Sequence, residues 1–339
     1  MQIALSFHFV NPKEANPLKE YDLLIGIDGG GTHSTAAAAW PDGRFAGIAL
    51  GAGLNYHHIG IDPIRCRLEG MVEELCRKTG AKHPLVCVGM SALDGPADPM
   101  THEKFCSNVF SKDQLDLQSD AYAALMGFTR GQPGMIVICG TGSMLLLLDD
   151  DGNQLVSGGW GYLLADAGSG YTLSREALLA VIDESEGLAP ATSLTALALE
   201  YFGVDAPRKI IDKVYAPEFT PDRLAGFAKH VLIQAETGDA VALDVLNSTM
   251  PKLAAQAAQL LKKAPGANCV GLYGGIFAHS RIARDCFIKT LAELAPQAKI
   301  CSFDYPPELG AIIHLMRREG ILNDDVLARL KTTYEEAKR

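Results

Sequence analysis

The sequence lacks the features that define several other classes of protein. No apolar run approaches 18 residues, so we expect no membrane-spanning helix. Acidic side chains outnumber basic ones, 40 against 30, which argues against a nucleic-acid or anionic-membrane surface. Residues 1–10 are apolar but have no preceding basic residue and no small-residue cleavage site. We therefore expect residues 1–21 to form an N-terminal extension, not a signal peptide.

Cysteine is present, but without a paired pattern. The eight cysteines are scattered and form no Cys-x-x-Cys motif, so we expect them to be reduced, buried, small apolar residues. That usage is typical of a cytoplasmic protein. With 339 residues, 48% of them hydrophobic and 21% charged, the chain is long enough for two domains, each with its own core.

One pattern of apolar runs and glycine turns occurs twice. An apolar run leads into Gly29-Gly30-Gly31-Thr32, and a second run follows and ends at Asp42-Gly43. The pattern recurs at Gly140-Thr141-Gly142-Ser143 and at Asp151-Gly152. Glycines without Cβ let backbone amides crowd around an anion, and Thr and Ser hydroxyls add donors. Two such hairpins facing each other would bind a polyphosphate from both sides.

Other phosphate motifs fit less well. No Lys follows either turn, as a P-loop requires. A Rossmann fingerprint needs a helix after its glycines, whereas residues 34–40 run into Pro41-Asp42-Gly43 and are too few for one. A pair of ordinary hairpins remains the alternative, and the duplication favours phosphate binding.

The rest of the chain alternates strand and helix patterns, which predicts an α/β fold. We expect strands at 23–28, 34–40, 44–50, 85–88, 115–118 and 269–273 and helices at 63–79, 121–128, 172–184, 192–201, 221–236, 239–263, 280–294, 308–318 and 324–337. The Gly- and Pro-containing segment 129–134 is the best domain boundary.

The duplicated turns, together with Gly158-Gly159-Trp160-Gly161 and residues 166–171 (Asp-Ala-Gly-Ser-Gly-Tyr), resemble the N-acetylglucosamine kinase-like group that includes the BadF/BadG-type ATPases. This group belongs to the sugar kinase, Hsp70 and actin superfamily. The resemblance runs from about Leu23 to about Met316. It implies two ribonuclease H-like (actin-like ATPase) domains with an ATP cleft between them. The expected divisions are an extension at 1–21, domains at 22–130 and 131–323, and a C-terminal helix at 324–339 that can pack on the first domain.

The resemblance also implies an activity. It is that of an ATP-dependent kinase, a phosphotransferase that places phosphate on a hydroxyl, at O6, of N-acetylglucosamine or glucosamine. ATP and Mg²⁺ would be its cofactors, the sugar its small-molecule partner, and the group tends to form homodimers. The implied nucleotide contacts are Gly29, Gly30, Gly31, Thr32, Gly140, Thr141, Gly142 and, in the adenosine motif, Gly274 and Gly275.

Two aspartates have expected roles near the phosphates. Asp120 follows a predicted strand and resembles the catalytic Asp of the group, so we expect it to be the general base. Its alternative role is to cap the helix that follows. Asp28 would help to hold Mg²⁺, through water, and its alternative is an ordinary Asx turn.

The sugar contacts implied by the resemblance are Asn55, Ser91 and Asp166, with Asp120 and Thr141. A loop turn is the alternative for Asn55, and helix capping is the alternative for Asp166. The chain departs from the group at Ala167, where Glu is common, and at Ala165, where Gly is usual. The lost carboxylate leaves the identity of the sugar open.

Two other functions are compatible with the same ATP fold. One is an ATP-driven activator of a CoA-substrate reductase, but such relatives hold an iron–sulfur cluster on cysteines in Gly-rich surface loops, and Cys139 ends an apolar run instead. The other is a non-catalytic sugar sensor, against which the presence of Asp120 argues.

Overall fold

The computed structural model describes residues 21–106 and 110–338, so almost all of the expected N-terminal extension lies outside the described residues. The chain divides into two compact units. The first contains the residues up to 132, residues 151–153 and the residues from 302 onward, and the second contains 133–150 and 154–301. No helix in the described ranges is both long and apolar enough to cross a membrane.

The first unit is built on a five-stranded sheet in the order β3-β2-β1-β4-β5. Its strands are β1 (Leu23–Gly29), β2 (His33–Ala39), β3 (Phe45–Ala52), β4 (Pro84–Met90) and β5 (Leu115–Ser119). The first three form an antiparallel meander, and β4 and β5 run parallel to β1. Parallel strands need crossover connections, which the helices provide.

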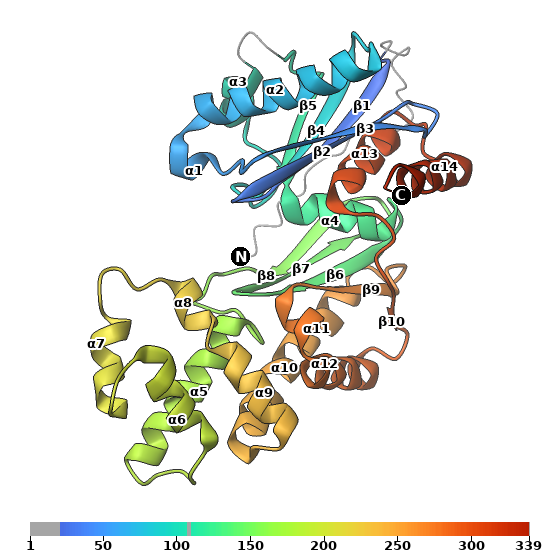
Figure 1. The fold of residues 1–339 in the computed structure, drawn as a ribbon. Coiled ribbons are helices and arrows are strands. Elements are labelled where there is room, and N and C mark those ends of the chain that lie inside the picture. Colours follow the sequence, from blue (N-terminus) through green and yellow to red (C-terminus); the bar gives the residue numbers. More distant parts are fainter. Residues whose placement is uncertain (1–20, 107–109, 339) are drawn as a thin grey trace. The chain divides into compact units, whose positions relative to one another are not determined.

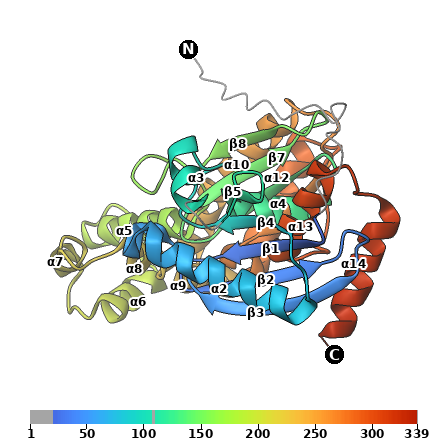
Figure 2. The same ribbon diagram turned by 90° about the horizontal axis from the view of Figure 1, so that it is seen from above.

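Helices cover both faces of this sheet (Figure 1). They are α1 (Tyr56–Ile59), α2 (Ile61–Thr79), α3 (Pro99–Cys106), α4 (Asp120–Thr129), α13 (Pro307–Arg318) and α14 (Asp324–Ala337). The apolar stripe of α2 packs on one face, where Ile64 and Leu68 join Ile25 in the core (Figure 2). On the other face α13 approaches β1 so closely that a Cβ on Gly26 would lie 2.0 Å from the carbonyl oxygen of Glu308.

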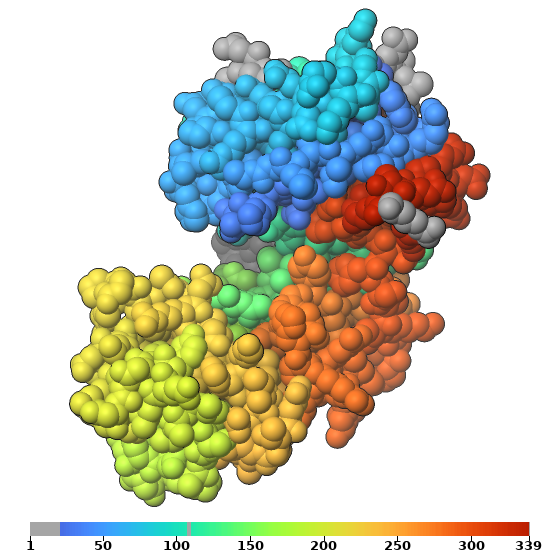
Figure 3. Space-filling model, viewed as in Figure 1, coloured from blue at the N-terminus to red at the C-terminus, as the bar shows by residue number. Residues whose placement is uncertain are grey.

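The C-terminal helix α14 packs beside β3. In Figure 3, residues near the C-terminus (red) lie next to residues near the start of the first unit (blue). The rings of Phe45 and Tyr334 meet edge to face with centroids 5.1 Å apart, and the Thr333 hydroxyl accepts a hydrogen bond from the Phe45 amide. The helix therefore belongs structurally to the unit that begins the chain.

The second unit repeats the strand order of the first. Its sheet, β10-β9-β6-β7-β8, is formed by β6 (Gly134–Cys139), β7 (Ser143–Leu148), β8 (Gln154–Gly158), β9 (Cys269–Tyr273) and β10 (Lys299–Ile300). Three strands again form an antiparallel meander, followed by two parallel strands. The two glycine turns thus occupy equivalent places, each between the first two strands of a sheet.

The remaining helices pack into one core with this second sheet. They are α5 (Gly170–Ser185), α6 (Ser193–Phe202), the 3₁₀ turn Pro207–Lys209, α7 (Ile210–Val214), α8 (Pro221–Ala225), α9 (Ala228–Thr237), α10 (Ala240–Leu261), α11 (Gly275–His279) and α12 (Arg281–Leu294).

The structure differs from several of the sequence-based expectations. Residues 302–323, expected in the second domain, lie in the first unit because α13 packs on β1 and α4. The helix expected at 221–236 is broken into α8 and α9. The expectation of reduced, buried cysteines holds for Cys87, Cys106 and Cys139 only. Cys269 and Cys301 form a disulfide, Cys66 is exposed, and Cys76 and Cys286 are partly exposed.

Candidate active site

In the first unit, the residues singled out from the sequence meet where three parallel strands end. Asp28 is near the end of β1, Ser91 follows β4 and Asp120 follows β5. The Ser91 amide donates to the carbonyl oxygen of Gly29 (3.0 Å), and a Cβ on Gly89 would lie 3.2 Å from the Asp120 Cα. The carboxyl ends of strands in open α/β sheets are the usual place for ligand sites.

Asp120 begins α4 but does not cap it. The capping residue is Ser119, whose hydroxyl accepts from the Tyr122 amide (3.1 Å). The Asp120 carboxylate accepts from the adjacent Ala121 amide (2.6 Å). Burial raises the pKa of Asp120, and the charge of Asp94 adds to this, although the amide partly opposes it. Asp120 is thus a carboxylate that capping does not require, with increased affinity for a proton.

Asp28 lies in a negatively charged environment. Its pKa is raised to about 6 by burial and by the charges of Glu308 and Asp120. Glu308 is itself buried and accepts a hydrogen bond from the Tyr334 hydroxyl (2.8 Å). No three His, Cys, Asp or Glu side chains in the described ranges group closely enough to form a metal site. Asp28 thus has two negatively charged neighbours, Glu308 and Asp120, at the end of β1.

The first glycine turn is fixed by the loop that follows β3. The carbonyl oxygens of Gly30 and Thr32 accept from the amides of Leu54 (3.0 Å) and Gly53 (2.9 Å). None of the glycines in this turn has a positive φ. At Gly31, an added Cβ would meet no protein atom within 4 Å, so packing within the protein does not require glycine there.

Asn55, expected to bind the sugar, has a local structural role. It caps the short helix α1, and its Oδ1 accepts from the His57 amide (3.0 Å). This corresponds to the loop-turn alternative for that residue. Ser91 differs, because its Oγ is buried without a hydrogen-bond partner among the described residues.

In the second unit, the turn at Gly140 is tied to the start of α5. Its carbonyl oxygens at Gly140 and Thr141 accept from the amides of Gly170 (2.8 Å) and Tyr171 (3.1 Å). Thr141 is exposed, and a Cβ on Gly140 would again meet nothing within 4 Å. The turn is therefore held from behind while open space remains on its outer side.

Asp166 lies against this turn with one carboxylate oxygen unused. It is 7% exposed, and a Cβ on Gly142 would lie 2.9 Å from its Oδ2. Burial raises the pKa of Asp166, while hydrogen bonds from the amides of Ser143 and Gly161 act against that rise. Its Oδ1 is buried without a partner in the described part of the chain. The cap of α5 is Ser169, so Asp166 is not needed for capping.

The segment expected to be the adenosine motif lies beside the same turn. Gly274 has φ 101°, and a Cβ there would lie 2.4 Å from the carbonyl oxygen of Cys139, so only glycine fits. Gly275 begins α11 and is under no such constraint, since its Cβ would be 4.0 Å from the nearest atom, on His279.

Sequence reasoning missed several residues close to these sites. Glu308 adds negative charge beside Asp28, and Asp116, Tyr122 and His314 form a hydrogen-bonded group around the strand and helix that flank Asp120. Glu308 and His314 lie on α13, far along the chain, and no local pattern marks them as neighbours of the site.

Comparison with known proteins identifies similar sugar kinases. An N-acetyl-D-glucosamine kinase of Dictyostelium discoideum is 27% identical over 86% of this chain and 97% of its own length. An N-acetylmuramic acid/N-acetylglucosamine kinase of Clostridium acetobutylicum is 24% identical, with the same coverage.

Solved structures resemble this chain over most of its length. A Chromobacterium violaceum protein described as a putative N-acetylglucosamine kinase is 26% identical, with a TM-score of 0.66 over 87% of this chain and 99% of that one. A ROK-family glucokinase of Streptomyces griseus, solved with glucose and AMPPNP, shares the fold at 19% identity, 87% and 99% coverage and a TM-score of 0.51. The expected actin-like sugar kinase fold is confirmed. The model of the BadF/BadG/BcrA/BcrD ATPase family matches residues 25–313, and the chain belongs to that family.

Proposed function

We propose that this protein is an ATP-dependent kinase that phosphorylates the 6-hydroxyl of an amino sugar, N-acetylglucosamine or glucosamine. Asp120 is the observation that carries the proposal. It is a half-buried carboxylate that follows β5, a parallel strand at the edge of the first sheet, its pKa is raised, and capping is left to Ser119. Such a group can accept the proton of a sugar hydroxyl as phosphoryl transfer proceeds. The similarity to two amino sugar kinases supports the choice of substrate class.

Residues of each unit have distinct roles in this proposal. In the first unit, the Gly29–Thr32 turn binds phosphate oxygens, and Asn55 and Ser91 contact the sugar. In the second, Gly140, Thr141 and Gly142 bind phosphates, Gly274 and Gly275 accommodate the adenosine, and Thr141 and Asp166 contact the sugar. The unpartnered oxygens of Ser91 and Asp166 support their roles, because a sugar hydroxyl can both donate and accept a hydrogen bond.

Mg²⁺ would be held beside Asp28, through water, and would neutralise phosphate charge. Its fit rests on the excess of buried negative charge around Asp28. We further propose that the protein is a cytoplasmic homodimer, as the resemblance implies. The Cys269–Cys301 disulfide is unusual for that compartment and is tested below.

A substrate screen tests the proposal. ADP release would be measured with MgATP and a panel of hexoses, hexosamines and N-acetylhexosamines, and the product would be identified by mass spectrometry and NMR. We expect a sugar-dependent rate with N-acetylglucosamine or glucosamine and a 6-phosphate product. ATP hydrolysis that is independent of every sugar would contradict the kinase proposal and favour the reductase activator. Binding of sugar without ADP release would favour the sensor.

A further inference from the structure

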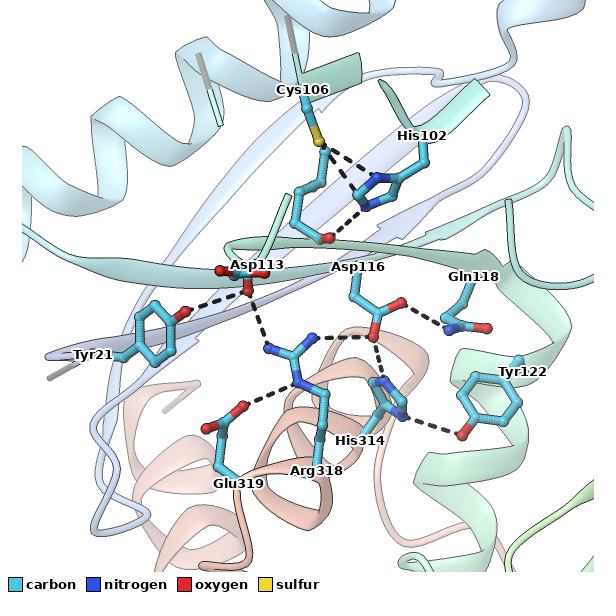
Figure 4. Close-up of polar contacts among 11 residues, drawn as sticks. Tyr21, His102, Cys106, Asp113, Asp116, Gln118, Tyr122, His314, Arg318 and Glu319 are labelled. Carbon is cyan, nitrogen blue, oxygen red and sulfur yellow. Dashed lines mark hydrogen bonds and ion pairs between the residues drawn. The ribbon is translucent and has the colours of Figure 1, made fainter. Parts of the chain in front are cut away.

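His314 of α13 contacts both elements that meet at Asp120. Its Nε2 is 2.7 Å from Asp116 Oδ2 on β5, and its Nδ1 is 3.1 Å from the Tyr122 hydroxyl on α4 (Figure 4). In the sequence, Asp116 of β5 comes before Asp120, and Tyr122 of α4 comes after Asp120. One imidazole thus connects the strand before Asp120 to the helix that starts there.

The contacts of this group are mutually consistent. Since a carboxylate can only accept, the His314 Nε2 carries a proton and donates it to Asp116. Arg318 Nη1 lies 3.3 Å from the same oxygen, and Gln118 Nε2 donates to the other oxygen (2.8 Å). Burial acts to raise the pKa of Asp116, but His314, Arg318 and Gln118 hold it well below its usual range. The carboxylate therefore remains charged and keeps its partners at neutral pH.

The group is buried at the point where it joins these elements. Tyr122 is 1% exposed and His314 is 4% exposed. Asp116 and Gln118 are alternate residues of β5, so they share one face of the sheet, which α4 contacts at β5 and on which α13 packs at β1 and β4. A buried ion pair contributes little net stability compared with apolar packing, whereas hydrogen bonds at both ring nitrogens of His314 hold it to β5 and to α4 in one arrangement. This favours a geometric role over a purely stabilising one.

We propose that His314 is a positioning residue for phosphoryl transfer, which holds the β5–α4 junction through Asp116 and Tyr122 and thereby directs the Asp120 carboxylate at the acceptor hydroxyl. The inference rests on the proposed function of Asp120. Misplacement of a reacting group by about 1 Å can cost on the order of 10²-fold in rate. Loss of one of the two contacts should therefore reduce kcat more than it affects substrate binding.

Tyr122→Phe is the central test, since it removes the hydroxyl that contacts His314 and keeps the ring. We expect kcat to fall about tenfold, with the KM values for ATP and sugar within about twofold of wild type. His314→Gln can still donate to Asp116 and bond to Tyr122, whereas His314→Leu can do neither. The Gln variant should therefore retain a larger share of wild-type kcat than the Leu variant.

Tyr305→Phe is the matched control. It also removes a buried hydroxyl in the first unit, one that donates to the Leu327 carbonyl oxygen (3.0 Å), far along the chain from Asp120. Its melting temperature should fall about as much as that of Tyr122→Phe, with kcat unchanged. The inference is overturned if Tyr122→Phe retains wild-type kcat, if its KM values rise in proportion, or if Tyr305→Phe loses as much kcat. If His314→Leu fails to fold, the Tyr122→Phe variant still tests the positioning role of His314.

The failure of this inference can be distinguished from that of the proposed function. If the wild-type protein phosphorylates no sugar, the proposed function fails. If Asp120→Asn is inactive while folded Tyr122→Phe and His314→Gln proteins turn over at the wild-type rate, only the positioning role fails.

Discussion

At the scale of single residues, the role proposed for Asp120 as the base can be tested directly. Asp120→Asn keeps the size of the side chain and removes its ability to take a proton. We expect kcat to fall by about 10²–10⁴ while the affinity for an ATP analogue is nearly unchanged. Steady-state kinetics and titration calorimetry would measure the two effects. Asp98→Asn is the control, because Asp98 is exposed and its role in turning the start of α3 can be taken by Asn. A variant that keeps more than half of wild-type kcat would rule out the role of Asp120.

Gly140 allows a separate test of phosphate binding at the second glycine turn. Because an added Cβ meets nothing within the protein, Gly140→Ala should leave the melting temperature nearly unchanged. If phosphate approaches the turn there, the methyl group should raise the KM for ATP about tenfold, as overpacking by one carbon commonly costs about 1–3 kcal/mol. Gly70→Ala on α2 is the control, since its Cβ also meets open space. An unchanged KM would mean that the turn at Gly140 is only a hairpin.

The sequence singled out residues that stand in local motifs. Asp120, Asp166 and the glycine turns each follow a recognisable run of residues, and this made them candidates. It could not assign the cap of α4 to Ser119 instead of Asp120, because both residue types cap helices. Nor could it place His314 against Asp116, since that contact joins residues separated by 198 positions. Such contacts depend on tertiary packing and leave no local pattern.

At the scale of helices and strands, Asp239 joins two helices. It caps α10 by accepting from the Ala242 amide (3.0 Å), and it also accepts from the Thr192 hydroxyl and the Ser193 amide at the start of α6. Burial acts to raise the pKa of Asp239, but these hydrogen bonds lower it to about 2. The charged carboxylate is thus favoured in the folded state.

Asp239→Ala should lower the free energy of unfolding at pH 7 by about 1–2 kcal/mol, the usual effect of losing a cap. The folded pKa lies below the unfolded value of about 3.9, so this contribution is present above that pH and is lost as the pH falls towards 2. Denaturant unfolding at pH 7 and at pH 2.5 would measure the difference between wild type and variant. If the free energies of unfolding of wild type and variant differed equally at both pH values, the stabilisation would not depend on the charge of Asp239. Asp239→Asn should retain most of the cap.

The predicted helix at 221–236 was wrong because contacts with residues distant in the sequence compete with the helical preference of the segment. In an unbroken helix over 221–236, the Arg223 carbonyl oxygen would accept from the Phe227 amide. Instead it accepts from the Tyr201 hydroxyl (2.8 Å), and the Phe227 amide donates to Leu224. The helix therefore ends at Ala225 and α9 begins at Ala228. The break falls at Gly226, a weak helix former, where the Tyr201 hydroxyl from α6 lies so close that a Cβ would be 2.4 Å from it.

At the scale of the whole molecule, each unit has its own sheet and its own core, and the repeated strand order explains why the sequence contains the same glycine turn twice. The duplication could be detected in the sequence because it consists of local apolar runs and glycine turns. The sequence did not reveal that α13 belongs to the first unit, because this depends on close contact between helices. A Cβ on Gly310 would lie 1.9 Å from the carbonyl oxygen of Ala123 in α4, so glycine permits this packing. The end of the chain thus completes the unit that the beginning starts.

The disulfide allows the stability of the two units to be tested separately. Cys269 and Cys301 both lie in the second unit and close a loop with a sequence separation of 32. A loop of that length contributes about 3–4 kcal/mol in the chain-entropy account. Under oxidising conditions, Cys301→Ser should therefore increase hydrogen exchange in peptides of residues 133–150 and 154–301 and leave those of 23–106 and 307–338 unchanged. Exchange measured by mass spectrometry localises the effect, and Cys66→Ser, at an exposed free cysteine of the first unit, is the control. Eight free thiols in the denatured, unreduced protein, or equal loss of protection in both units, would contradict the bridge as a stabilising feature of the second unit.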